Sequence, residues 1–325
     1  MNMRPLLEVR DLTVTFCLGG GLLAPKRTLV AVNGVSFQIA AGETFAVVGE
    51  SGSGKSTIAR AVMRLLEPRS GTVHLEGEEL TALHGEALRR MRPKLQMVFQ
   101  DPYSSLNPSQ LIGDVVGEPL RVHRRLKGPE LAQRVRALLE QVGLDSSHMN
   151  RYPHEFSGGQ RQRIAIARAV ALEPSLLVLD EAVSALDVST QNQILNLLED
   201  LRRARGIAYL FISHDLGVVQ HIADRVAVTY LGRIVETGPV DRIFADSRHP
   251  YTQALLSAVP VPNPRLQQSR RHKALAGDMP SPLAPPTGCP FHTRCPHAFD
   301  RCIREMPRHT RVEEGGTVAC HLHEA

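Results

Sequence analysis

The chain has 325 residues, of which 42% are hydrophobic and 22% charged, with a formal net charge of +5. This composition is ordinary for a soluble globular protein, and because the basic residues are spread along the sequence, charge gives only weak support for nucleic-acid binding. The start has no apolar core of signal-peptide length and no stretch approaches the roughly 18 apolar residues of a spanning helix, which predicts a cytoplasmic protein without membrane spans.

Two β-rich stretches open the chain, at residues 6–16 and 29–39, and a Gly/Pro loop at 19–25 separates them. Phe16 ends the first stretch. An aromatic ring there can stack on a nucleotide base, although an ordinary core or edge phenylalanine explains it equally well. Cys17, which follows, is expected to pack as a small apolar residue.

The next feature is an apolar strand at 44–48, a Gly-rich turn, and a helical pattern at 57–66. Such a turn points backbone N–H groups and a helix N-terminus at one spot, where they can surround phosphate oxygens. The glycines let the backbone wrap a phosphate, Lys55 can reach the β- and γ-phosphates, and the Ser56 hydroxyl suits Mg²⁺. The turn therefore predicts a nucleoside triphosphate site, whose members are Gly49, Glu50, Ser51, Gly52, Ser53, Gly54, Lys55, Ser56 and Thr57.

A strand pattern at 72–76 follows, and another at 95–99 leads into Gln100 and the loop residues Asp101, Pro102 and Tyr103. From about 103 to 154 the pattern changes to helical segments broken by prolines. This change predicts an inserted helical subdomain.

This segment is followed by the sequence Phe156-Ser157-Gly158-Gly159-Gln160, which lies directly before an amphipathic helical run at 161–172. Read locally, Ser157 is a helix cap and the glycines allow a tight entry. Read functionally, this is a second helix N-terminus with amides and a hydroxyl suited to phosphate.

An apolar run at 176–179 ends in Asp180 and Glu181, as expected for a strand buried on both faces of a parallel sheet. Two acids at this position are poor core residues. Asp180 would hold Mg²⁺ or its water, and Glu181 would orient and deprotonate an attacking water. A second apolar strand, 209–213, ends in His214, which is expected beside Glu181 because α/β folds place ligands at this sheet edge.

The ordered motifs resemble the nucleotide-binding subunit of an ABC transporter. They correspond to Walker A (49–56), the Q-loop (Gln100), the signature (156–160), Walker B (176–181), the D-loop (184–187) and the H-switch (His214). The resemblance covers residues 5–245. It implies an α/β P-loop NTPase fold of ABC type, with a mostly parallel core sheet, an antiparallel β subdomain, and a helical subdomain at about 103–170.

Three shorter segments narrow the resemblance. Residues 151–154, 187–189 and 249–256 are similar to the ATPases of dipeptide, oligopeptide and nickel importers, most of all to the second ATPase of a dipeptide importer. Phe156 and Ala182 depart from the commonest family residues, leucine and proline. Neither departure removes a catalytic group, so an active ATPase is expected.

The family resemblance implies a mechanism in which two subunits sandwich two ATP molecules. Each ATP lies between one partner's 49–57 loop and the other's signature residues Ser157, Gly158, Gly159 and Gln160, beside the D-loop Asp187. Ser56, Gln100 and Asp180 would hold Mg²⁺. Glu181 would act as general base and His214 would hold the γ-phosphate and water.

The same resemblance implies partners. These are a sibling ABC ATPase, with a heterodimer favoured, two membrane-spanning permease subunits, and an extracytoplasmic peptide-binding protein, with no nucleic acid. The chain would be peripheral, on the cytoplasmic face of the inner membrane. A soluble ABC ATPase acting on ribosomes or DNA is the alternative, but the single motif set and the lack of a heptad run favour the importer. Nickel and haem stay open as other cargoes.

The C-terminal extension, 246–325, begins with a Pro-rich linker and carries Cys289, Cys295, Cys302 and Cys320. In a reducing compartment such crowding suggests a metal rather than disulfides. Four thiolates suit an iron–sulfur cluster or zinc; no Cys-x2-Cys knuckle supports a zinc ribbon, but nearby histidines (His292, His297, His321, His323) keep a mixed zinc site open. In peptide-importer ATPases a similar set is associated with a [4Fe–4S] cluster, so the resemblance favours the cluster, as a structural clasp or a redox sensor.

Overall fold

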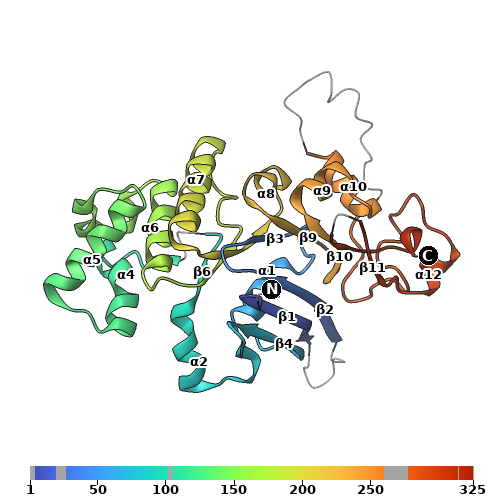
Figure 1. Ribbon diagram of the computed structural model, residues 1–325, viewed down its shortest axis with the longest axis horizontal. Helices are drawn as coiled ribbons and strands as arrows, with labels where there is room; N and C mark the ends of the chain where they lie inside the picture. Colours follow the sequence, from blue (N-terminus) through green and yellow to red (C-terminus); the bar gives the residue numbers. More distant parts are fainter. Residues whose placement is uncertain (1–3, 20–26, 102–104, 260–276, 314, 325) are drawn as a thin grey trace. The chain divides into compact units, whose positions relative to one another are not determined.

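The computed structural model describes residues 4–19, 27–101, 105–259, 277–313 and 315–324 (Figure 1). Most of the predicted loop at 19–25, together with Pro102, Tyr103 and the start of the Pro-rich linker, lies outside the described residues. The chain forms two compact units. Unit 1 comprises Met1–Leu7, Ile39–Glu43 and Leu75–Ile212, and unit 2 comprises Glu8–Gln38, Thr44–His74 and Ser213–Ala325.

Unit 1 holds three parallel strands in the order β8-β7-β6. Every residue of β7 and β8 is buried, as expected for short apolar strands covered on both faces. The register pairs Asp180 with Ile212, so the acids that follow β7 emerge at the carboxyl edge of these strands. The strands of this unit are β5 Glu78–Glu79, β6 Leu95–Val98, β7 Leu176–Asp180 and β8 Ala208–Ser213.

Helices α4, α5 and α6 of unit 1 pack against one another (Figure 1) and form the predicted helical subdomain. Each buries an apolar stripe, such as Val135, Leu138 and Leu139 on α5. Helix α6 begins three residues earlier than predicted, at Gly158, because Ser157 caps it. The helices are α2 Gly85–Met91, α4 Ile112–Pro119, α5 Gly128–Gln141, α6 Gly158–Val170 and α7 Val188–Arg205.

Unit 2 contains a mixed sheet in the order β11-β12-β10-β9-β3 and a second sheet in the order β2-β1-β4. β3 pairs parallel with β9, whereas the β9–β10, β10–β12 and β11–β12 pairs are antiparallel. The strands are β1 Leu7–Leu18, β2 Arg27–Ile39, β3 Thr44–Val48, β4 Ser70–Leu75, β9 Arg225–Tyr230, β10 Arg233–Pro239, β11 His309–Arg311 and β12 Thr317–Ala319.

The helices of unit 2 are short. α1 follows the Gly-rich turn as predicted, and α9 and α10 follow β10 (Figure 1). They are α1 Lys55–Val62, α8 Leu216–Ile222, α9 Val240–Ala245, α10 Pro250–Ser257 and α12 Asp300–Arg304. Across the described part of both units, no helix combines the length and apolarity that crossing a bilayer requires.

A buried carboxylate on β10 ties the C-terminal region of unit 2 together. Glu236 is 0% exposed, and its oxygens accept hydrogen bonds from Arg242 Nη1 (2.7 Å) and from the backbone N–H groups of Arg248 (2.8 Å) and His249 (3.0 Å). The sequence predicts that the nucleotide-binding domain ends at residue 245, and this boundary stays a prediction. The hydrogen bonds of Glu236 join residues on both sides of it, all within unit 2.

Replacing Arg242 by methionine tests this network. The Arg242 side chain is 4% exposed, so Arg242→Met would leave the Glu236 carboxylate buried without its cation. We expect the free energy of unfolding to fall by about 3–5 kcal/mol in urea denaturation. Arg304→Met, which removes an exposed pair with Asp300, should change it by no more than about 0.5 kcal/mol. Equal losses in the two variants would contradict the role given to Glu236.

Candidate nucleotide site

The predicted phosphate loop, residues 49–57 in unit 2, has glycines at two points of close approach. A Cβ on Gly49 would lie 2.3 Å from the Thr229 carbonyl oxygen, and a Cβ on Gly54 would lie 2.4 Å from that of Ala31. Gly54 also has φ of +99°, in the left-handed region that L side chains rarely adopt. Only glycine therefore fits either position without moving the backbone beside it.

Polar side chains hold the loop from beneath. Ser53 is 0% exposed, and its hydroxyl shares a hydrogen bond of 3.1 Å with the Thr229 hydroxyl. Lys55 is 5% exposed, and its ammonium donates to the carbonyl oxygens of Gly49 (2.9 Å) and Glu50 (3.0 Å). Ser51 and Gly52 are exposed at the tip of the loop. The loop thus presents an open tip above a fixed base, with an ammonium group held beside it.

Two residues far along the chain contact the loop, and sequence reasoning assigned them no role there. The backbone N–H of Glu50 donates to the Tyr251 hydroxyl (2.9 Å), and the Arg294 guanidinium binds the Glu50 carboxylate. Tyr251 lies in the segment 249–256, whose sequence indicated only a resemblance to peptide-importer ATPases. No local pattern could have identified either contact, because each joins residues about 200 or more positions apart.

The candidate base in unit 1 is held by its neighbours. Gln100 Nε2 donates to Glu181 Oε2 at 3.0 Å, which brings together two of the predicted catalytic side chains. Glu181 has φ of +50°, a left-handed conformation that costs about 1–3 kcal/mol in a non-glycine residue. Its backbone N–H donates to Ile212, and its carbonyl accepts from the hydroxyl (2.9 Å) and N–H (3.1 Å) of Ser184. These bonds compensate the strain and fix where the carboxylate emerges.

The signature residues begin helix α6. Ser157 and Gln160 form a reciprocal capping box, in which the Gln160 N–H donates to the Ser157 hydroxyl (3.3 Å) and the Ser157 N–H donates to the Gln160 side chain (3.0 Å). A Cβ on Gly159 would lie 2.3 Å from Thr190 Cγ2. Gly158 and Gly159 are half-buried. The cap interpretation of Ser157 is confirmed, and its contact with nucleotide stays a prediction.

The D-loop aspartate also caps a helix. The Asp187 carboxylate accepts hydrogen bonds from the backbone N–H of Thr190 (2.9 Å) and from its hydroxyl (2.7 Å). These hydrogen bonds, the backbone one first, hold the pKa of Asp187 below its usual range. Asp187 therefore carries its negative charge at the N-terminus of α7, where the helix dipole favours an anion.

The remaining predicted site residues occupy three different settings. Asp180 is 4% exposed at the end of β7, and His214 is exposed directly after β8, two positions beyond the residue that pairs with Asp180. Phe16 lies half-buried near the end of β1. Ser56 and Thr57 are half-buried in the first turn of α1.

The four C-terminal cysteines do not form the metal site that the sequence predicts. They are free, as is Cys17. Burial raises the pKa of Cys289 to about 11, so this thiol stays protonated near neutral pH. No group of three or more His, Cys, Asp or Glu side chains among the described residues is placed to hold a metal ion. The predicted iron–sulfur or zinc site therefore has no support from this geometry.

Three of the four nearby histidines are committed to hydrogen bonds. The ring of His292 contacts the Cys289 carbonyl (2.9 Å), that of His321 lies between Glu324 and the Glu305 carbonyl, and that of His323 contacts the Arg248 carbonyl (3.0 Å). These roles explain their positions without a zinc ion.

Cys17 is exposed, and the prediction that it packs as an apolar residue is wrong. It is the penultimate residue of β1, and Leu18 beyond it is 43% exposed. The last two residues of β1, Cys17 and Leu18, therefore extend beyond the buried part of the strand.

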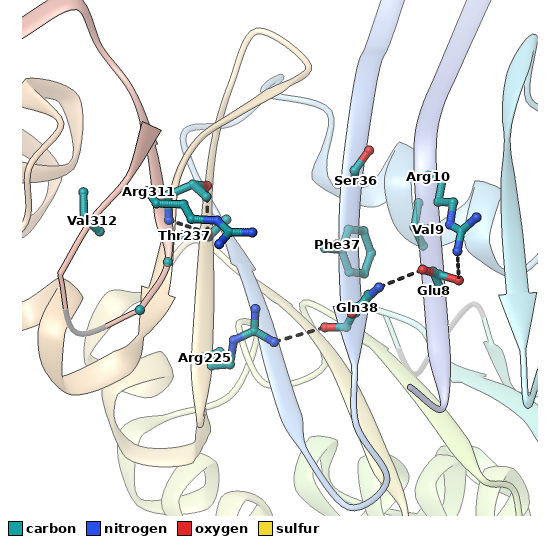
Figure 2. A pocket seen from close by; sticks show the side chains of 13 residues that line it. Glu8, Val9, Arg10, Ser36, Phe37, Gln38, Arg225, Thr237, Arg311 and Val312 are labelled. Carbon is teal, nitrogen blue, oxygen red and sulfur yellow. Dashed lines mark hydrogen bonds and ion pairs between the residues drawn. The ribbon is translucent and has the colours of Figure 1, made fainter. Parts of the chain in front are cut away.

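Unit 2 also contains a pocket of about 820 Å³, lined by residues of β1, β2, β9, β10 and the β11–β12 segment (Figure 2). On one wall Glu8 accepts from Arg10 Nη2 (2.8 Å) and Gln38 Nε2 (2.7 Å), and Arg225 Nη1 donates to the Gln38 carbonyl (3.2 Å). Arg311 projects from β11 (Figure 2). None of the described residues that line this pocket belongs to the predicted nucleotide site.

Comparison with known proteins gives two family matches. Residues 32–184 match the ABC transporter family, and residues 235–302 match the oligopeptide/dipeptide transporter C-terminal region. Among solved structures, a dimeric ATP-binding cassette in a post-hydrolysis state, bound to ADP and Pi, is 29% identical with a TM-score of 0.65. That match covers 72% of this chain and 98% of the other.

Full-length relatives give the finer assignment. A probable peptide ABC transporter ATP-binding protein of Sinorhizobium fredii is 52% identical over 98% of this chain and 90% of its own length. The di/tripeptide transport ATP-binding protein DppF of Pseudomonas aeruginosa is 50% identical over 98% of both chains, and the oligopeptide transport ATP-binding protein OppF of Escherichia coli is 50% identical over 93% and 92%.

The fold and the motifs define an ATP-hydrolysing ATPase of the ABC type, and the predicted fold class is confirmed. The chain belongs to the family of ATP-binding proteins that energise oligopeptide and dipeptide ABC transporters. This match along the whole chain favours the transporter over the soluble ABC ATPase.

Proposed function

We propose that the chain binds ATP·Mg²⁺ at its phosphate loop and hydrolyses it to drive import of short peptides through membrane-spanning partners. The observation that carries the proposal is the hydrogen bond from Gln100 to Glu181, which fixes a carboxylate at the end of a buried strand. A general base has to be held within reach of the water that it deprotonates. The strained but fully hydrogen-bonded backbone of Glu181 provides that fixed position.

The nucleotide would be held by the loop Gly49–Thr57. The support is chemical fit, since a cradle that a Cβ on Gly49 or Gly54 would obstruct lies beside the Lys55 ammonium. Ser56, Gln100 and Asp180 would hold Mg²⁺, which would offset negative charge on the phosphates. Phe16 would stack on the base, and His214 would position the γ-phosphate and water.

A second ATPase would complete the site. One chain presents its signature residues at the N-terminus of α6, where backbone amides and the helix dipole favour an anion. In the dimer, Ser157, Gly158, Gly159 and Gln160 would face the partner's ATP, with Asp187 beside them. The dimeric solved structure bound to ADP and Pi supports this arrangement. A sibling ATPase rather than an identical chain would be the partner.

The complex would be a membrane importer of di- or oligopeptides. Its other members would be two permease subunits and an extracytoplasmic peptide-binding protein, with this chain peripheral on the cytoplasmic face of the inner membrane. Peptide is favoured over nickel or haem because the relatives that match along nearly the full chain are named for peptide transport.

A [4Fe–4S] cluster on Cys289, Cys295, Cys302 and Cys320 completes the proposal, with Zn²⁺ as the alternative. Its support is the chemistry of the donor set, four free cysteines in one segment of the chain. The described side chains form no metal-ready group, so no step of ATP hydrolysis is assigned to the cluster.

Glu181→Gln tests the general base. We expect ATP hydrolysis to fall by at least about 10²–10⁴-fold, because an amide cannot accept the proton, while ATP still binds and the dimer accumulates. Phosphate release and size-exclusion chromatography with ATP measure the two effects. Glu173→Gln is the matched control, since Glu173 also has a positive φ (+57°) in unit 1 but pairs with Arg134 on the surface. Near-normal hydrolysis by Glu181→Gln would refute the assignment.

Purification of the tagged chain from native membranes in mild detergent tests the transport function. Mass spectrometry should identify two multi-span subunits and a second ATPase, because the ATP sandwich and the permeases form one assembly. Recovery only with ribosomal or DNA-repair proteins would leave the ATPase standing and exclude transport. The Lys55→Ala chain should recover the same permease partners, because the lysine acts on nucleotide.

Iron and acid-labile sulfide analysis of anaerobically prepared protein tests the cluster. We expect about four of each per chain, since a [4Fe–4S] cluster contains four iron atoms and four inorganic sulfides. Replacing Cys17, which is exposed and outside the segment, should leave both contents unchanged, whereas Cys302→Ser should lower them. Zinc without sulfide would establish the alternative metal. If iron, sulfide and zinc were all absent, the cysteines would be free thiols and the proposed cluster would be refuted.

A further inference from the structure

The cysteine segment of unit 2 sends one side chain to the phosphate loop. Arg294 directly precedes Cys295, and its guanidinium donates to both oxygens of Glu50, from Nη1 at 2.9 Å and from Nη2 at 3.2 Å. The two residues are 244 positions apart. Paired parallel hydrogen bonds between guanidinium and carboxylate fix direction as well as distance. The side chain of Arg294 is only 6% exposed, whereas that of Glu50 is 26% exposed, so the guanidinium end of the pair is the one shielded from water.

Aromatic packing holds Arg294 in place. The rings of Tyr230, Tyr251 and Phe291 are wholly buried and contact one another, with centroids 4.7–5.4 Å apart. The Arg294 guanidinium carbon lies 5.9 Å from the Tyr230 ring centroid, and the backbone N–H of Arg294 donates to the Phe291 carbonyl (3.0 Å). The guanidinium therefore packs against a buried aromatic cluster.

Glu50 connects this cluster to the groups expected to bind phosphate. Its carbonyl accepts hydrogen bonds from the Lys55 ammonium (3.0 Å) and from the Ser53 N–H (3.2 Å), and its N–H donates to Tyr251 (2.9 Å). A displacement of Glu50 would move the start of the loop and the resting place of Lys55. Its carboxylate also brings a negative charge to a loop that has to receive a polyanion, and like charges repel.

We propose that Arg294 is a positioning residue for the phosphate loop, acting through Glu50: it neutralises that carboxylate and fixes the first turn of the loop for ATP. The cysteine segment is then a structural support of the ATP site, whatever its thiols hold. This inference rests on the proposed function, because it concerns the same loop. Lysine cannot replace Arg294 fully, since an ammonium lacks the two parallel donors.

A double-mutant cycle on the full-length chain tests the proposal, with MgATP binding measured by calorimetry. Arg294→Gln should weaken MgATP binding on the order of tenfold, because Glu50 loses its hydrogen-bonded charge partner. The affinity of Arg294→Lys should lie between those of Arg294→Gln and the wild type. In a Glu50→Gln background the same Arg294→Gln change should alter the dissociation constant by less than about twofold, because no carboxylate is left unpaired. An equal loss in both backgrounds, or no loss in either, would overturn the proposal.

Two controls separate positioning from general destabilisation. Arg301→Gln removes a half-exposed arginine of the same segment, which pairs with Glu305 and Glu324, and should leave binding unchanged. Leu138→Ala, at a buried position of α5 in unit 1, should lower the thermal midpoint of unfolding without changing affinity at temperatures where the variant is folded. If Leu138→Ala weakened binding as much as Arg294→Gln, the loss would be one of stability, and the inference would fail.

The cycle also distinguishes the inference from the function on which it rests. Wild-type binding that is lost in Lys55→Ala supports the ATP site independently of Arg294. If the wild type failed to bind MgATP, or Lys55→Ala bound it equally well, the proposed function would fail and the inference with it. If Lys55→Ala lost binding but Arg294→Gln did not, only the inference would fail.

Discussion

The buried carboxylate of Glu236 is the interaction that holds the C-terminal part of unit 2 together. It accepts hydrogen bonds from Arg242 on α9 and from the backbone ahead of α10. His249 then caps α10 through its ring nitrogen, and burial lowers the pKa of His249 to about 3, which keeps the ring neutral and able to accept that bond. α10 in turn carries Tyr251 to the loop. A chain of polar contacts thus connects β10 to the loop proposed to bind ATP.

Polar groups so deeply buried are stable only because each has partners. A carboxylate in this position would cost several kcal/mol if left unpaired, as would the Arg242 guanidinium. The same reasoning applies at Glu50, where Arg294 offsets a negative charge in a loop built for anions. The chain therefore has paired charges beside the proposed nucleotide loop, and both partners of the Arg294–Glu50 pair lie in unit 2.

The carboxylate proposed as general base depends on a strained backbone. Glu181 occupies a left-handed conformation directly after the buried strand β7, and Ser184 and Ile212 hold its backbone there. The strained turn directs the side chain out of the sheet edge, where Gln100 contacts it. Strain of this kind persists when the surrounding structure compensates it, and it is common where a side chain has to be aimed. The geometry agrees with ATP hydrolysis by an ABC ATPase of the peptide-transporter family.

The sequence alone determined the features that depend on neighbours in the chain. The apolar runs at β3, β7 and β8, the Gly-rich turn and the cap at Ser157 are local patterns, so the motifs and the ABC fold could be predicted from them. Only the tertiary structure decided which distant side chains support those motifs: Arg294 and Tyr251 at Glu50, and the partners of Glu236 across residue 245. It also decided that Cys17 is exposed. The physical reason is that a buried charge needs its partner in space, and nothing in the spacing of residues along the chain specifies which distant side chain that partner is.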